Sequence, residues 1–227
     1  MAGELDGPRL APHAGTARQL VVFLHGYGAD GNDLINIGRE WQPYLPQAAF
    51  VSPHAPEPCQ EAPPGRQWFP LTFRDPNERW RGVNKAAPGL QRFLDAELER
   101  HKLPPSALAL VGFSQGTMMA LHVGLRRATA PAAIVGYSGL LVLPPDVDAE
   151  AFAAEIKSRP PVLLVHGDRD DLIPPQALFQ ATQGLAALDV PAEWHLSPGI
   201  GHGIDSEGLR HGGEFLARRW GGLRPGR

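Results

Sequence analysis

The sequence has little cysteine and little net charge. Cys59 is the single cysteine among 227 residues, so no intramolecular disulfide and no cysteine-based zinc site can form. Lys and Arg number 21 against 24 Asp and Glu, giving a net charge of −3 at pH 7. Nucleic-acid-binding domains usually carry a basic surface or stripe. The charge balance therefore argues against a nucleic-acid partner.

The sequence also lacks a convincing membrane-spanning segment. Residues 107–125 and 128–145 contain no Asp, Glu, Lys or Arg. A spanning helix needs about 20 mostly apolar residues, but glycine, proline and polar residues interrupt both segments. We expect buried parts of a water-soluble core and no stable membrane insertion. The first 15 residues have no apolar signal-peptide region, so the expected location is cytoplasmic.

Short apolar runs alternate with helical patterns along the chain. Runs that are apolar without alternation predict strands buried on both faces, as in a parallel sheet. The expected strands are 20–24, 48–51, 108–111, 132–135, 162–165 and 192–196, and the expected helices are 88–102, 115–127, 175–188 and 206–220. This order predicts an α/β fold with a mainly parallel sheet and helices on both faces. We expect a single domain over residues 1–227.

A candidate nucleophile follows the strand expected at 108–111. The segment Gly112-Phe113-Ser114-Gln115-Gly116 matches G-x-S-x-G, in which a sharp strand-to-helix turn raises the serine above the sheet. The start of the next helix favours negative charge at the same point. We predict that Ser114 is the catalytic nucleophile. Ser138, a rival serine, does not fit the motif and is expected to be structural.

A serine nucleophile needs a general base, because its hydroxyl is weakly reactive at neutral pH. His202 lies in a glycine-rich segment that allows close approach to neighbouring backbone, and it is the predicted base. His195 falls in an expected strand and His211 in an expected helix. Both are predicted to be structural or exposed.

An orienting carboxylate is expected between the serine and the histidine in the chain. Three candidates follow the strand expected at 162–165, and these are Asp168, Asp170 and Asp171. Their spacing alone does not choose among them.

Attack on an ester creates an oxyanion, which needs preorganised hydrogen-bond donors. One donor is usually the N–H after the nucleophile, and the other comes from an earlier loop. We predict the backbone N–H groups of Gln115 and of Tyr27, which follows the first expected strand. The neighbouring His25 side chain is expected to stabilise this turn.

Together these motifs resemble the phospholipase/carboxylesterase family of α/β-hydrolases, which includes acyl-protein thioesterases and lysophospholipases. The resemblance extends from about Gln19 to Trp220. Its marks are Leu24–Asp33, Trp68-Phe69, Gly112–Gly116, His166–Asp170 with Ile173-Pro174, and Gly201-His202. In the family pattern H-G-x-x-D-x-x-[VI]-P the catalytic Asp is the fifth residue, which corresponds to Asp170.

The resemblance implies an α/β-hydrolase fold and a serine hydrolase that cleaves carboxylic esters through an acyl-enzyme. Its substrate would be a small-molecule ester or a lipid, and the reaction needs neither a metal nor an organic cofactor. Asp170 would hold the tautomer of His202 and stabilise its imidazolium. Two alternatives are an acyl-protein thioesterase and a non-catalytic ligand-binding member of the fold. The residues do not predict the oligomeric state.

Residues 54–83 form a long segment rich in proline and aromatic residues. Connections longer than about 12–15 residues are usually functional or disordered, and the aromatic residues argue against disorder. The resemblance implies a lid-like loop over the active site, with Trp68 and Phe69 in contact with substrate. The alternative is that both rings anchor a surface connection to the core.

Overall fold

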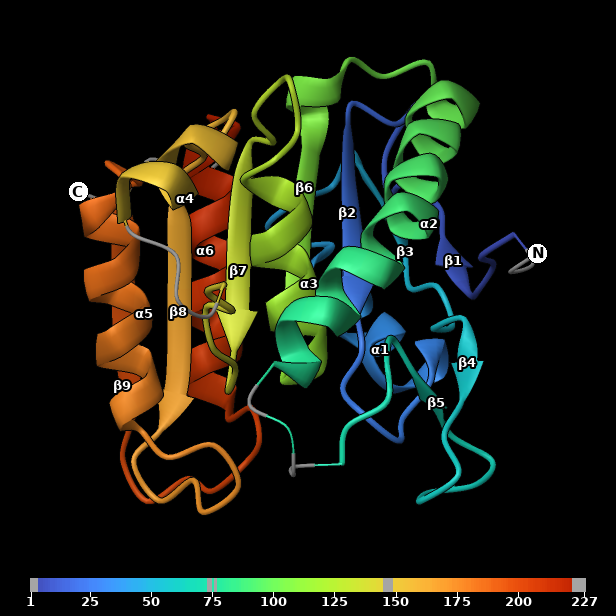
Figure 1. The fold of residues 1–227 in the computed structure, drawn as a ribbon. Coiled ribbons are helices and arrows are strands. Elements are labelled where there is room, and N and C mark those ends of the chain that lie inside the picture. The colour runs from blue at the N-terminus through green and yellow to red at the C-terminus, as the bar shows by residue number, and fades with distance from the viewer. Residues whose placement is uncertain (1–3, 73–74, 76, 145–148, 222–227) are drawn as a thin grey trace.

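The computed structural model describes residues 4–72, 75, 77–144 and 149–221 and is centred on one seven-stranded sheet (Figure 1). The strand order is β1-β3-β2-β6-β7-β8-β9, and every neighbouring pair is parallel except β1 with β3. The strands are β1 (Arg9–Leu10), β2 (Gln19–Leu24), β3 (Ala48–Val51), β6 (Leu108–Phe113), β7 (Ala133–Tyr137), β8 (Val162–Gly167) and β9 (Ala192–Ser197). A separate antiparallel pair joins β4 (Glu57–Pro58) to β5 (Arg66–Gln67).

Helices cover both faces of the sheet. The first face packs against α2 (Glu78–His101), α3 (Gln115–Gly124), α4 (Ala149–Glu155) and α5 (Gln176–Ala187), and the second against α1 (Gly31–Trp41) and α6 (Ser206–Arg219). In β2, Leu20 and Val22 enter the first core and Val21 and Phe23 the second, and all four are fully buried. Burial on both faces explains why the central strands are apolar without alternation.

The predicted α/β class and all six expected strands are confirmed. Helices α1 and α4 and the short strands β1, β4 and β5 were not expected. The start of α2 was predicted wrongly, because the helix begins at Glu78 and contains Pro88. Proline is favoured in the first turn of a helix, where its missing N–H costs nothing, so the sequence indicated a start there.

The segment at 54–83 contains more regular secondary structure than expected. It contains the β4–β5 pair, and its last residues are the first turns of α2. Residues 73, 74 and 76 of this segment lie outside the described residues.

The two long uncharged segments now have a structural explanation. Residues 107–125 contain β6 and all of α3, whose ten residues are all buried. Residues 128–145 contain β7, a central strand of the sheet. No helix within the described parts of the chain has both the length and the apolar character needed to cross a bilayer.

The two edge strands of the sheet are unlike each other. At one edge, β1 has only two residues, and at the other edge β9 pairs with β8 alone. Side chains alternate along β9, so that Trp194 contacts Phe179 of α5 on one face. On the opposite face, Glu193 pairs with arginines of α6 and His195 lies against His211 of α6.

Candidate active site

Ser114 lies in a sharp turn between β6 and α3. Its backbone has φ 53° and ψ −114°, a sparsely populated conformation that costs roughly 1–3 kcal/mol. A Cβ at Gly112 would overlap the backbone of Gly116, and a Cβ at Gly116 would overlap the Leu24 carbonyl. The expected need for glycine at both positions follows from these close approaches. The turn leaves Ser114 8% exposed.

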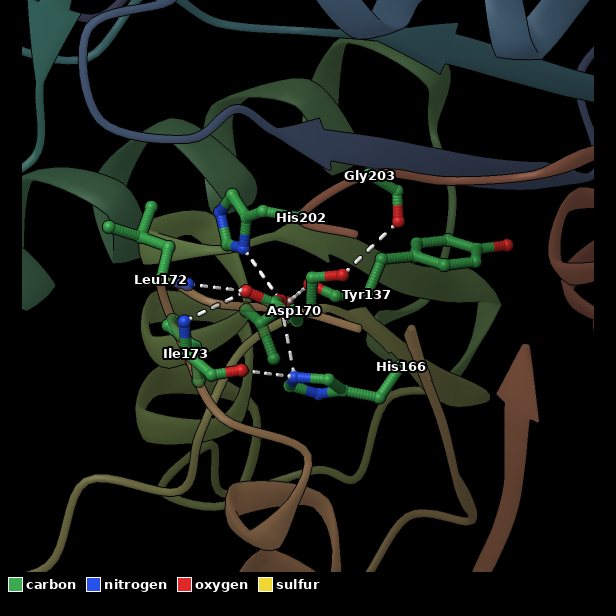
Figure 2. Close-up of polar contacts among 9 residues, drawn as sticks. Tyr137, His166, Asp170, Leu172, Ile173, His202 and Gly203 are labelled. Atoms are coloured by element: carbon green, nitrogen blue, oxygen red, sulfur yellow. Dashed lines mark hydrogen bonds and ion pairs between the residues drawn. The ribbon is translucent and has the colours of Figure 1, made fainter. Parts of the chain in front are cut away.

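Asp170 forms a hydrogen bond with His202 through the side chains of both residues. The Oδ2 atom of Asp170 lies 2.8 Å from Nδ1 of His202 (Figure 2). The Oδ1 atom accepts hydrogen bonds from the backbone N–H groups of Leu172 and Ile173, at 3.0 and 2.8 Å. These donors fix the orientation of a carboxylate that is only 2% exposed. With Nδ1–H donating to Asp170, Nε2 of His202 is free to accept a proton.

A second imidazole also contacts Asp170. The Nε2 atom of His166 lies 2.8 Å from the Ile173 carbonyl oxygen and 3.3 Å from Oδ2 of Asp170 (Figure 2). A carbonyl oxygen only accepts hydrogen bonds, so the Nε2 atom carries the hydrogen. His166 is 2% exposed, and its contacts with Ile173 and Asp170 hold the turn that positions the carboxylate. The sequence indicated His166 only as part of a motif and gave no sign of this contact.

The nucleophile turn and the His202 segment lie against each other. The rings of Phe113 and His202 have their centroids 5.0 Å apart. A Cβ at Gly26 would lie 3.0 Å from the Phe113 ring and 3.4 Å from Cβ of Ser114. The structure thus brings the segments after β2, β6 and β9 together at the carboxyl ends of the strands, where ligands bind in parallel α/β sheets.

The loop that carries His202 is fixed at several points. The Ser138 hydroxyl donates to the Gly203 carbonyl at 3.1 Å, and Asp168 accepts from the Gly199 N–H at 2.6 Å. Ser138 is therefore structural, as expected, and Asp168 holds the loop. Asp171 is exposed. Among these three carboxylates, the hydrogen bond to His202 is made by Asp170.

The His25 ring fixes the turn that contains Tyr27. Its Nε2 atom accepts a hydrogen bond from the Ala55 N–H at 2.9 Å, and its Nδ1 atom lies 2.8 Å from the Gly26 carbonyl oxygen. Burial lowers the pKa of His25 to about 4, so the ring is neutral near pH 7. With both nitrogens engaged, His25 stabilises the turn as expected and is not available as a base.

The two predicted oxyanion donors are both unengaged. Gln115 is the first residue of α3, so its N–H has no acceptor within the helix. Within the described residues, neither this N–H nor that of Tyr27 has a hydrogen-bond acceptor. An oxyanion hole needs such unengaged donors, and the role of these two N–H groups stays a prediction.

Trp68 and Phe69 are buried, at 1% and 0% exposure. The Gln115 side chain joins them to the nucleophile turn, because it accepts from the Trp68 N–H and donates to the Phe69 carbonyl, both at 2.8 Å. The Trp68 indole also donates to the His25 carbonyl at 3.0 Å. These contacts favour the anchoring alternative, and substrate contact by the two rings stays a prediction.

Comparisons with known proteins agree with the fold and the motifs. A model of the phospholipase/carboxylesterase family matches residues 5–219. The chain is similar to acyl-protein thioesterase 1 of Gibberella zeae, with 25% identity over 93% of this chain and 95% of that protein. It is also similar to esterase YpfH of Escherichia coli K12, with 25% identity over 86% of this chain and 80% of that protein.

A solved structure supports the same assignment. The crystal structure of esterase PE8 superimposes with a TM-score of 0.88 at 43% sequence identity, covering 95% of this chain and 99% of that one. Since the family match spans nearly the whole chain, the protein belongs to the phospholipase/carboxylesterase family of α/β-hydrolases, serine hydrolases that cleave carboxylic esters and thioesters.

Proposed function

We propose that the protein hydrolyses carboxylic esters with Ser114 as nucleophile, His202 as general base and acid, and Asp170 as the orienting group. The supporting observation is the 2.8 Å hydrogen bond between Asp170 and His202. The ring of that histidine packs beside Phe113, the neighbour of the strained serine. Strain of this kind is typical of functional sites, where the surrounding structure holds it in place.

In the proposed reaction, Oγ of Ser114 bonds to the ester carbonyl carbon while its proton moves to Nε2 of His202. The carbonyl oxygen becomes an oxyanion that accepts from the N–H groups of Tyr27 and Gln115. The bond to the alcohol then breaks, and the alcohol leaves with the proton from His202. Water attacks the acyl-enzyme by the same steps and restores Ser114.

The stabilisation of charge comes from backbone groups that need no rearrangement during the reaction. Removing one oxyanion donor typically lowers kcat by about 10²–10³. The N-terminus of α3 adds a favourable dipole at the same point. No step in this sequence requires a metal or an organic cofactor.

A cavity beside the nucleophile turn is the proposed position of the acyl group. Its volume is about 280 Å³, and Leu140–Leu143, Trp80 and Ala181 are among its lining residues. Leu140 follows Gly139, where a Cβ would lie 2.9 Å from the Ser114 carbonyl oxygen. One segment of the chain therefore joins the Ser114 backbone to the wall of the cavity, and the leucine side chains of that wall suit an acyl chain.

Substitution of Ser114 by alanine tests the proposed nucleophile. The variant should lose hydrolysis of p-nitrophenyl esters, and loss of a triad nucleophile costs on the order of 10⁶ in kcat in subtilisin. A fluorophosphonate probe should label the wild type and fail to label this variant. Ser138→Ala, the matched control, should still be labelled. Unchanged esterase activity in Ser114→Ala would contradict the proposal.

The acyl-protein thioesterase alternative rests on the similarity to the Gibberella zeae protein. Esters and thioesters of the same acyl group, from acetyl to palmitoyl, distinguish the two activities by their kcat/KM. A folded wild type that neither hydrolyses any of them nor reacts with the probe would favour the non-catalytic alternative. The cytoplasmic location and the single domain stay predictions.

A further inference from the structure

Two histidines and a glutamate meet on the face of β9 that α6 covers. The potential ligand atoms of His195, Glu207 and His211 all lie within 4.8 Å of one another. The centroids of the two imidazole rings are 4.4 Å apart. The Nε2 atom of His211 lies 3.7 Å from a carboxylate oxygen of Glu207. In Figure 1, α6 lies behind β8, on the opposite side of the sheet from α5.

The local structure explains why these side chains converge. Glu207 and His211 are four residues apart in α6, so they share one face of the helix. His195 points to the same face because side chains alternate along β9. Hydrogen bonds of the fold do not account for the cluster, since Nε2 of His195 is buried and has no partner among the described residues. Buried polar atoms are normally paired, so an orphaned one requires an explanation.

We propose that His195, Glu207 and His211 bind a divalent transition-metal ion, with Zn²⁺ as the preferred metal. Imidazole nitrogen and carboxylate oxygen are common zinc ligands, at about 2.0–2.2 Å from the ion. Hard ions such as Ca²⁺ and Mg²⁺ prefer sites made entirely of oxygen, and this cluster is not one. Water would complete a tetrahedral shell around the metal.

The present geometry is close to that of a metal-bound site. Ligand atoms about 2.1 Å from a tetrahedral ion are about 3.4 Å apart. The Glu207 and His211 atoms are 3.7 Å apart, and the ligand atoms of all three residues lie within 4.8 Å of one another. Side-chain rotation can close the remaining distance, because the Glu207 and His211 side chains are 52% and 32% exposed. Arg210 also lies 3.7 Å from Glu207 but pairs more closely with Glu214, at 3.0 Å. Glu207 is therefore available to a metal.

The site would connect the two ends of the loop that carries His202. His195 precedes this loop in β9, and Glu207 and His211 follow it in α6. A bound metal would add a crosslink between strand and helix in the folded protein. Such a ligand stabilises the folded state in proportion to the logarithm of its concentration above Kd. This role does not depend on the proposed ester hydrolysis.

Calorimetric titration of the chelator-treated protein with ZnCl₂ tests the site. The wild type should bind one Zn²⁺ per chain, and free Zn²⁺ at about 100 times Kd should raise Tm by about 5–10 °C. Glu207→Gln and His211→Ala should each weaken binding by at least about 10-fold. The exposed position of Glu207 makes its variant the safer one for folding, which circular dichroism checks.

His13→Ala, in an exposed segment, is the matched control and should retain the wild-type affinity. His202→Ala should also bind Zn²⁺ as the wild type does. Absence of binding by the wild type at 1 mM ZnCl₂ would overturn the proposal. Binding that survives in Glu207→Gln and His211→Ala but is lost in His202→Ala would also overturn it, because the ion would then lie in the active site.

Discussion

The Gln115 side chain should contribute strongly to stability, although its predicted catalytic role belongs to its backbone. Gln115→Ala removes the acceptor of the Trp68 N–H and the donor to the Phe69 carbonyl. All three residues are at most 1% exposed, so water does not readily replace the lost partner. A buried polar group left without a partner costs about 1–3 kcal/mol. Two such groups predict a loss of about 2–6 kcal/mol in the free energy of unfolding.

Urea unfolding followed by tryptophan fluorescence measures this loss. Gln180→Ala is the matched control, because Gln180 is exposed in the middle of α5 and should change stability by less than about 0.5 kcal/mol. The Gln115 backbone N–H remains in the variant, so residual esterase activity is expected from the folded fraction. If Gln115→Ala were no less stable than Gln180→Ala, the reasoning about buried unpaired groups would be wrong.

Three further predictions concern strain, a buried ion pair and pH. Ser114→Gly should be more stable than Ser114→Ala by about 1–2 kcal/mol in urea unfolding, because glycine adopts φ 53° without strain; equal stabilities would contradict the assigned strain. Arg9→Ala should destabilise the protein by about 3 kcal/mol, because it leaves Glu97, at 2% exposure, with Arg100 as its remaining cation. Arg100→Ala should cost less, since Arg9 makes two hydrogen bonds to Glu97, and the reverse order would refute this. Burial lowers the pKa of His122 to about 3. Between pH 6.5 and pH 3, His122 therefore binds a proton in the unfolded chain but not in the folded protein. As pH falls over this range, this group should lower the free energy of unfolding by up to about 1.4 kcal/mol per pH unit. His122→Phe should reduce the slope of the free energy of unfolding against pH. An unchanged slope would exclude His122 as its source.

Much of the fold could be predicted because its strands are apolar on both faces. In β2, β6 and β8 the pattern arises from burial alone and needs no knowledge of neighbours. Helix boundaries were harder to predict where local signals conflict with tertiary packing. Pro88 is a signal for a helix start, yet the preceding residues Gly82 and Val83 are buried in α2, where Gly82 packs directly against Phe69. That contact depends on the chain returning to the helix and cannot be inferred from propensity.

Only part of the candidate site could likewise be predicted from local sequence patterns. Ser114 and His202 were chosen as candidates because each lies in a local pattern that follows a strand. The His166 contact with Asp170 and the Gln115 contacts with residues 68 and 69 could not be predicted. They depend on which face of a strand or turn a side chain occupies after folding. The cluster of His195, Glu207 and His211 was missed for the same reason.

The edges of the sheet have a consequence for the protein at high concentration. An exposed edge strand offers unpaired backbone groups to another molecule and is a route to aggregation. The two-residue β1 is too short to serve as a template. On β9, Glu193 lies 3.0 Å from both Arg218 and Arg219, so a strand arriving from another molecule would meet a cluster of charges. The short β1 at one edge of the sheet and the charged residues beside β9 at the other edge therefore limit fibre-like stacking of neighbouring molecules.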